Sequence, residues 1–92
     1  MSAYGYSWIA KNDADVVRVL RSAAGAQERR DLAQRVDAWN RQRLAEKQQR
    51  LRLYREQCRQ GRSCGASAAL AQEVMAYRTS IRYWGKVLRA MA

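Results

Sequence analysis

Apolar residues recur at alternating spacings of three and four between positions 66 and 91. Val74, Ile81 and Leu88 lie seven residues apart, and a second series with the same period runs between them. The second series consists of Leu70, Tyr77, Trp84 and Met91. Such alternation is typical of the a/d seam of a coiled coil. The pattern therefore predicts a helix over residues 66–91 that packs through one apolar edge.

Residues 26–60 contain neither proline nor glycine, which favours one long helix. The seam that would match the first one consists of Ala33, Val36, Asn40, Leu44, Lys47, Leu51, Tyr54 and Cys58. Asn40 and Lys47 are polar, and polar residues in such a seam cost stability while fixing the register of the pair. We expect residues 26–60 to pack along this seam on residues 66–91.

The link over residues 60–65 contains Gly61 and Gly65 and is short enough to make the two helices antiparallel. Residue numbers of opposed positions then sum to about 122, so that Leu51 faces Leu70 and Cys58 faces Cys64. The predicted fold class is all-α in a single domain, 1–92. It consists of a short N-terminal helix and a long antiparallel helical hairpin that is coiled-coil-like and could pair with a second copy as a four-helix bundle.

The N-terminal part is predicted to hold an extended arm over residues 1–11 and a short helix over residues 13–24. Tyr4, Tyr6 and Trp8 alternate in the arm, which places three rings on one side of an extended chain. They either lie across the helices or stay exposed for a partner. Asn12 or Asp13 is a suitable N-cap for the short helix, and we expect Gly25 at its C-terminal end.

One flank of the hairpin is expected to be apolar at its open end. There Leu32 and Trp39 meet Trp84 and Met91, and a short amphipathic helix could cover them. The residues predicted to form the core or a protein-interaction surface are Leu32, Trp39, Leu44, Leu51, Tyr77, Ile81, Trp84 and Leu88.

The chain is strongly basic, with a net charge of +10 from 18 Lys and Arg against 8 acids. Such a charge favours an anionic partner, either nucleic acid or an acidic protein surface. A GC-rich genome would raise the Arg content but would not explain the scarcity of acids. On a helical wheel, nine basic side chains fall on one face of the hairpin, which we expect to stay uncovered. They are Arg30, Arg41, Arg52, Arg55, Arg59, Arg78, Arg82, Lys86 and Arg89.

Enzymatic chemistry is not expected. The chain has no His, the usual general base and metal ligand, and no glycine pattern of a phosphate-binding loop. Two cysteines do not supply the four ligands of a structural zinc site, so neither a metal nor a cofactor is predicted. Cys58 and Cys64 could form a disulfide that closes the link, whereas a reducing compartment would keep them as thiols.

Location and family are only weakly constrained. No apolar run reaches the ~18 residues of a membrane span, and no signal peptide is visible, so we expect a soluble, cytoplasmic protein. Leu53, Tyr54 and Arg55 spell the tripeptide of the mitochondrial LYR assembly factors. In that family the tripeptide lies near the start of the first helix, whereas here it lies late in the long helix. The resemblance therefore assigns no family.

Two functions remain as hypotheses. The first is contact with the phosphate backbone of nucleic acid through the basic face, as part of a larger assembly. The alternative is a protein-protein adaptor or regulator, similar to an antiactivator or an assembly factor, that uses the seam and the Trp-rich surface without nucleic acid. Binding to a membrane surface is a weaker third possibility because the basic face lacks a broad apolar surface opposite it.

Overall fold

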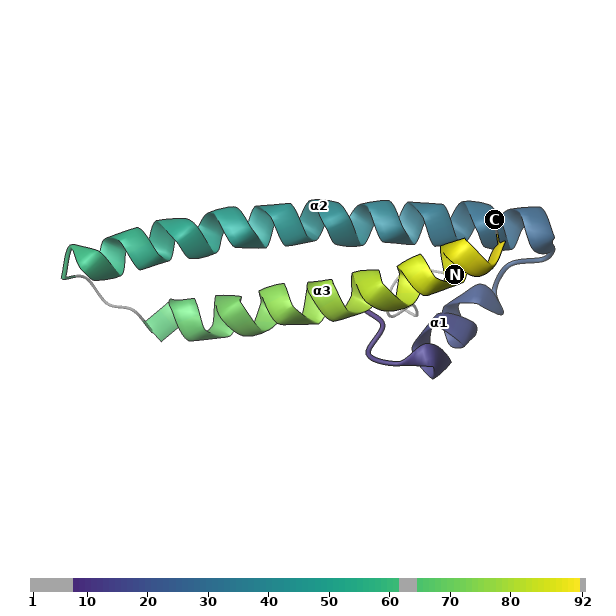
Figure 1. The fold of residues 1–92 in the computed structure, drawn as a ribbon, viewed down its shortest axis with the longest axis horizontal. Coiled ribbons are helices and arrows are strands. Elements are labelled where there is room, and N and C mark those ends of the chain that lie inside the picture. The colour runs from purple at the N-terminus through teal and green to yellow at the C-terminus, as the bar shows by residue number, and fades with distance from the viewer. Residues whose placement is uncertain (1–7, 62–64, 92) are drawn as a thin grey trace.

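The computed structural model describes residues 8–61 and 65–91, and it confirms the all-helical hairpin. Its helices are α1 (Asp13–Leu20), α2 (Ala26–Arg59) and α3 (Gly65–Met91). Figure 1 shows α2 and α3 running antiparallel side by side, with α1 packed at the open end of the hairpin. The molecule measures 53 × 29 × 18 Å. Tyr4 and Tyr6 of the predicted arm lie outside the described residues, and the pairing of two copies stays a prediction.

Glycines delimit α2 at both ends. Gly25 has extended backbone and occupies the N-cap of α2, so its predicted role at the end of the first helix is wrong. Gly61 follows the C-cap with a φ of 82°, and its N–H donates to the Cys58 carbonyl at 3.0 Å. A left-handed residue at this position ends a helix, and glycine adopts that conformation without strain. The 34 helical residues between them agree with the predicted range to within one residue.

Helix α1 begins as predicted but ends earlier, at Leu20 instead of residue 24. Asn12 is its N-cap, and its Oδ1 accepts a hydrogen bond from the Asp15 N–H at 3.0 Å. Beyond Leu20 the backbone donors are taken by other groups. The Ser22 N–H and hydroxyl both donate to the Val19 carbonyl, and the Ala24 N–H donates to the Glu28 carboxylate of α2 at 2.8 Å. Side chains that compete for backbone groups stop the helix there.

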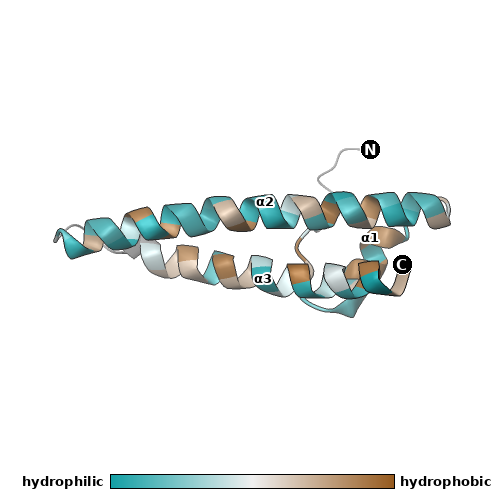
Figure 2. Cartoon of the chain, turned by 45° about the horizontal axis from the view of Figure 1, so that its top comes forward, coloured by the Kyte–Doolittle hydropathy of each residue, from teal (hydrophilic) through white to brown (hydrophobic). Residues whose placement is uncertain are grey.

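The predicted seams are buried where α2 and α3 meet. The buried residues of α2 are Ala33, Val36, Asn40 and Leu51, and those of α3 are Leu70, Val74, Tyr77, Ser80 and Trp84. Lys47 reaches Glu73 across the seam at 3.1 Å, and their numbers sum to 120, close to the expected register. Figure 2 shows α2 as mostly hydrophilic along its length, so a narrow apolar stripe supplies its contact with α3.

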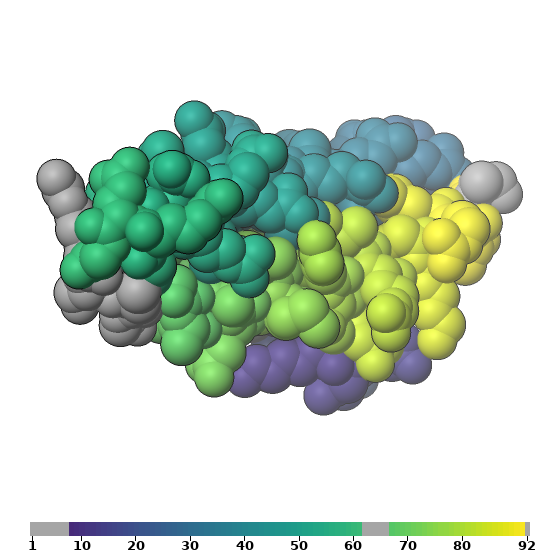
Figure 3. All heavy atoms as spheres, turned by 60° about the vertical axis from the view of Figure 1, so that its left-hand side comes forward, coloured from purple at the N-terminus to yellow at the C-terminus, as the bar shows by residue number. Residues whose placement is uncertain are grey.

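The core consists of two clusters along the hairpin. At the open end α1 contributes Val16 and Val19 to a cluster around Trp84, which is completely buried. The short helix therefore shares a cluster with Leu32, Trp84 and Met91 of the predicted apolar patch, whereas Trp39 has Trp8 and Tyr77 as its ring neighbours. Near the loop end Leu51, Leu70 and Val74 form a smaller cluster whose members keep 5–7% of their surface exposed. Figure 3 shows α2, α3 and α1 packed against one another in space-filling view.

The segment before α1 is fixed between α2 and α3 by buried polar side chains. Asn40 Nδ2 donates to the Trp8 carbonyl at 2.9 Å, and the Ala10 N–H donates to Ser80 Oγ at 2.9 Å. Both Asn40 and Ser80 are 0% exposed. Since an unmade hydrogen bond is costly in the core, these two contacts hold the segment in one place.

Candidate functional site

The basic face opens as a groove between α2 and α3. One hollow of about 310 Å³ is lined by Arg41, Leu44, Ala45, Gln48, Arg78 and Ile81. A second of about 260 Å³ is lined by Gln48, Leu51, Arg52, Arg55, Val74 and Arg78. Because Arg78 and Gln48 line both, the two hollows adjoin each other. We call the four arginines of this hollowed surface, Arg41, Arg52, Arg55 and Arg78, the arginine groove.

The nine basic residues predicted for this face are all exposed but differ in their partners. Three form ion pairs: Arg41 with Asp37 at 2.9 Å, Arg59 with Glu56 at 3.0 Å and Lys86 with Asp13 at 3.4 Å. The remaining six form no ion pair with any other residue that the structure describes. They are Arg30, Arg52, Arg55, Arg78, Arg82 and Arg89. The structure therefore separates cations with an acid beside them from cations that can accept an external anion.

Five of the nine do not line the groove: Arg30, Arg59, Arg82, Lys86 and Arg89. Arg30 is near the open end, where its Nη2 donates to the Met91 carbonyl at 3.2 Å. Lys86 forms an ion pair with Asp13 of α1 while staying exposed, so α1 reaches the edge of the basic face at this position. The wheel could not show this contact because it included only the two long helices.

The floor of the arginine groove is aliphatic. Leu44 and Ile81 lie in one hollow, Leu51 and Val74 in the other, and among the described residues no aromatic side chain lines either. Guanidinium groups over such a floor can donate several hydrogen bonds to phosphate or carboxylate oxygens. Without a ring, the groove offers no platform for stacking a base.

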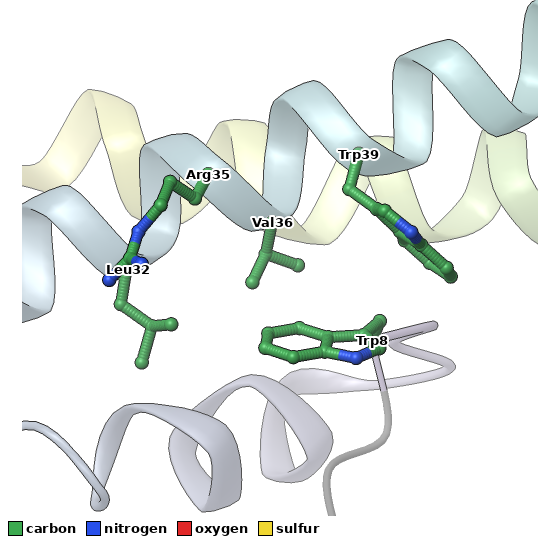
Figure 4. Close-up of a pocket in the computed structure, with 5 residues that line it drawn as sticks. All are labelled: Trp8, Leu32, Arg35, Val36 and Trp39. Carbon is green, nitrogen blue, oxygen red and sulfur yellow. The ribbon is translucent and has the colours of Figure 1, made fainter. Parts of the chain in front are cut away.

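The other flank of α2 carries a small pocket that the sequence did not predict. Trp8, Leu32, Arg35, Val36 and Trp39 line a cavity of about 240 Å³, which we call the tryptophan pocket. Figure 4 shows the Trp8 ring below Val36 and beside Trp39, with Arg35 at the Leu32 side. The sequence signal was the spacing of residues 32, 35, 36 and 39 on one helical face, but the contribution of Trp8 depends on the path of the segment before α1.

Aromatic and cationic groups surround Trp39. Its ring centroid lies 6.3 Å from that of Trp8, with an interplanar angle of 49°, and 5.9 Å from that of Tyr77. The Arg43 guanidinium carbon lies 5.8 Å from the same ring, within the range of a cation–π contact. Hydrogen bonding with the Tyr77 side chain raises the pKa of Arg43 above its usual range. Arg43 therefore stays charged beside the indole.

The other predicted site residues take the following places. Leu44 packs against the loop-end cluster, and Leu32 and Leu88 pack against the open-end cluster. Trp39, which the register opposed to Trp84, has Trp8 and Tyr77 as its ring neighbours. Cys58 is half-buried near the end of α2, whereas Cys64 lies outside the described residues. The disulfide between them stays a prediction.

Within the described ranges, 8–61 and 65–91, none of the helices combines the length and apolar character needed to cross a membrane. Over the same ranges, no three His, Cys, Asp or Glu side chains gather as a metal site would require. No protein-family model, curated protein sequence or solved structure matches this chain.

Proposed function

We propose that this protein binds the phosphate backbone of double-stranded nucleic acid through the arginine groove, without catalysis. The observation that supports the proposal is the convergence of Arg52, Arg55 and Arg78 on one hollow, with no acid paired to any of them among the described residues. Phosphate contacts from such cations release counterions and give affinity that does not depend on sequence.

The preference for a duplex follows from what lines the groove. Proteins that hold single strands combine basic side chains with aromatic rings on which bases stack. The groove has the basic side chains, and its lining includes no aromatic ring from the described residues, 8–61 and 65–91. Its arginines extend from residue 41 to residue 55 of α2, roughly 21 Å along the helix axis. This distance is shorter than one duplex turn of about 34 Å, so all four arginines can reach phosphates within a single turn. About four phosphate contacts are therefore expected, one for each arginine.

The test is fluorescence anisotropy with a labelled duplex of mixed sequence, titrated at several salt concentrations between 50 and 200 mM. Four contacts predict a slope of about −3.6 in a plot of log affinity against log salt concentration. A second duplex of unrelated sequence should bind with similar affinity, and a single strand of the same length should bind no more tightly. Absence of binding at the lowest salt, or affinity independent of salt, would contradict the proposal.

Pairing of two copies belongs to the same proposal. Leu53 and Met75 are 58% and 59% exposed, and pairing would let a second copy cover these side chains. Two copies in a four-helix bundle would carry two grooves and bind a long duplex with higher avidity. Light scattering at several protein concentrations tests the pairing, and a monomer throughout would contradict it.

A further inference from the structure

The tryptophan pocket has the size of one side chain. An apolar cavity of about 150 Å³ holds a benzene molecule, whereas sites for small-molecule ligands usually measure about 300–1,000 Å³. At about 240 Å³ the tryptophan pocket lies between these sizes. It therefore fits a single aromatic ring or branched aliphatic group better than a whole cofactor or metabolite.

The walls of the pocket are in place before any ligand binds. Trp8 is held through its carbonyl by Asn40, and the next residue but one, Ala10, is held through its N–H by Ser80. Val36 on the opposite wall is 1% exposed and part of the core. A rigid pocket costs less conformational entropy to fill than one that must form on binding.

Cations border this apolar pocket. Arg35 lines it, is exposed, and forms no ion pair with another residue in the described part of the chain. Arg43 lies over Trp39, and its Nη1 is 3.4 Å from Glu46 on the exposed surface. Trp and Arg are the residues most enriched in the energetic centres of protein interfaces. Because Arg43 already has Glu46 beside it, Arg35 is the cation at this pocket that is complementary to a carboxylate next to the inserted group.

A nucleobase fits this pocket less well. Stacking of a base requires a flat, open ring face. The two indole rings are tilted by 49° and lie against each other, and Trp39 also has Tyr77 and Arg43 beside it. Leu32 and Val36 complete the walls with branched aliphatic groups. The shape favours an inserted side chain over a stacked base.

From these observations we infer that the tryptophan pocket docks an acidic segment of a partner protein, which inserts one aromatic or leucine side chain and places an adjacent carboxylate against Arg35. This surface is separate from the arginine groove and does not depend on nucleic-acid binding. The protein would then hold an acidic protein on one flank of α2 and a duplex on the other.

The indole N–H groups of the three tryptophans provide a direct test by NMR on the full chain labelled with nitrogen-15. The probe is a short capped peptide with a central phenylalanine flanked on both sides by glutamates. Saturable shifts are expected for Trp8 and Trp39, while Trp84, which is 0% exposed, serves as an internal reference. Two control peptides replace the phenylalanine by alanine or the glutamates by glutamines, and both should bind at least about fivefold more weakly.

Substitutions locate the site. Arg35→Gln should weaken the acidic peptide about fivefold because it removes one exposed charge contact. Arg50→Gln is the matched control: it is also exposed on α2, but it lies about 22 Å along the helix from Arg35 and should bind the peptide as the parent does. Equal effects of the two substitutions would contradict the assignment.

Three other outcomes would overturn the inference. The first is the absence of shifts at Trp8 and Trp39 at millimolar peptide. The second is an equal response to the alanine control, which would indicate charge attraction alone. The third is a response of these two indoles to a single-stranded oligonucleotide but not to the peptide, which would identify the pocket as a base-stacking site.

Discussion

The two flanks of α2 use the same kinds of residue in opposite ways. On the arginine groove flank, Arg52 and Arg55 are exposed over an aliphatic floor and have no acid partner among the described residues. On the tryptophan pocket flank, Arg43 lies over an indole and beside Glu46. The first arrangement leaves Arg52 and Arg55 available to an external anion, whereas the second fixes Arg43 within the fold and leaves only Arg35 at the tryptophan pocket without an ion pair to another described residue.

This difference shows why net charge is a poor guide to where an anion binds. Arg41 and Arg52 are both exposed and occupy similar angles on the helix, but Asp37 lies 2.9 Å from Arg41. An internal acid competes with any external phosphate for the same guanidinium. The number of cations without an ion-pair partner is therefore a better guide to anion binding than the net charge. The following substitutions examine this number on each flank.

The largest expected effect is a loss of stability when the open-end cluster around Trp84 is disrupted. Trp84→Ala should lower the free energy of unfolding by about 3–5 kcal/mol because it empties the centre of the open-end cluster. Urea denaturation followed by circular dichroism measures the change. Val17→Ala is the control, since a side chain that is 48% exposed should cost less than about 0.5 kcal/mol. If both substitutions lowered the free energy of unfolding by similar amounts, the open-end cluster would not be the main source of stability at that end of the hairpin.

The next effect is on the arginine groove. Arg52→Glu combined with Arg78→Glu should weaken duplex binding about a hundredfold at 50 mM salt, since it removes two of about four phosphate contacts. Anisotropy measures the affinity, and circular dichroism checks that the helices remain. Arg29→Glu with Arg50→Glu changes the net charge equally at exposed positions outside the groove. If both pairs weaken binding alike, total charge and not the groove determines affinity.

A smaller effect on stability should show whether the two flanks of α2 bind their partners independently. Asn40→Ala removes the donor to the Trp8 carbonyl and should lower stability by about 1–2 kcal/mol. The indole signal of Trp8 and the affinity for the acidic peptide should change with it, while the affinity for duplex should not. A parallel loss of duplex binding would show that the flanks are not independent.

The smallest effect distinguishes a paired from an unpaired arginine. Arg55→Gln should weaken duplex binding about tenfold at 50 mM salt. Arg41→Gln should weaken it only about threefold, because Asp37 already neutralises part of the Arg41 charge. If the anisotropy titration showed equal losses of duplex affinity for the two substitutions, the ion pair between Arg41 and Asp37 would not weaken the contribution of Arg41 to binding.

Much of the fold follows from periodicity and helix-ending residues. The absence of Gly and Pro predicted α2 almost to the residue, and the a/d spacing predicted the burial of Val36, Leu51, Val74 and Trp84. The end of α1 was missed because Ser22 and Glu28 compete for backbone groups beyond Leu20. Such competition depends on where the following helix begins, which propensity alone does not define.

The candidate site divides in the same way. The sequence by itself determined that α2 and α3 present arginines on a shared face, because helical geometry sorts residues by angle whatever surrounds them. Only the tertiary structure decided that Lys86 faces Asp13, that Trp8 closes a pocket with Leu32 and Trp39, and that Ser80 is buried. These contacts join residues far apart in sequence, and their positions depend on how the segment before α1 packs across the hairpin.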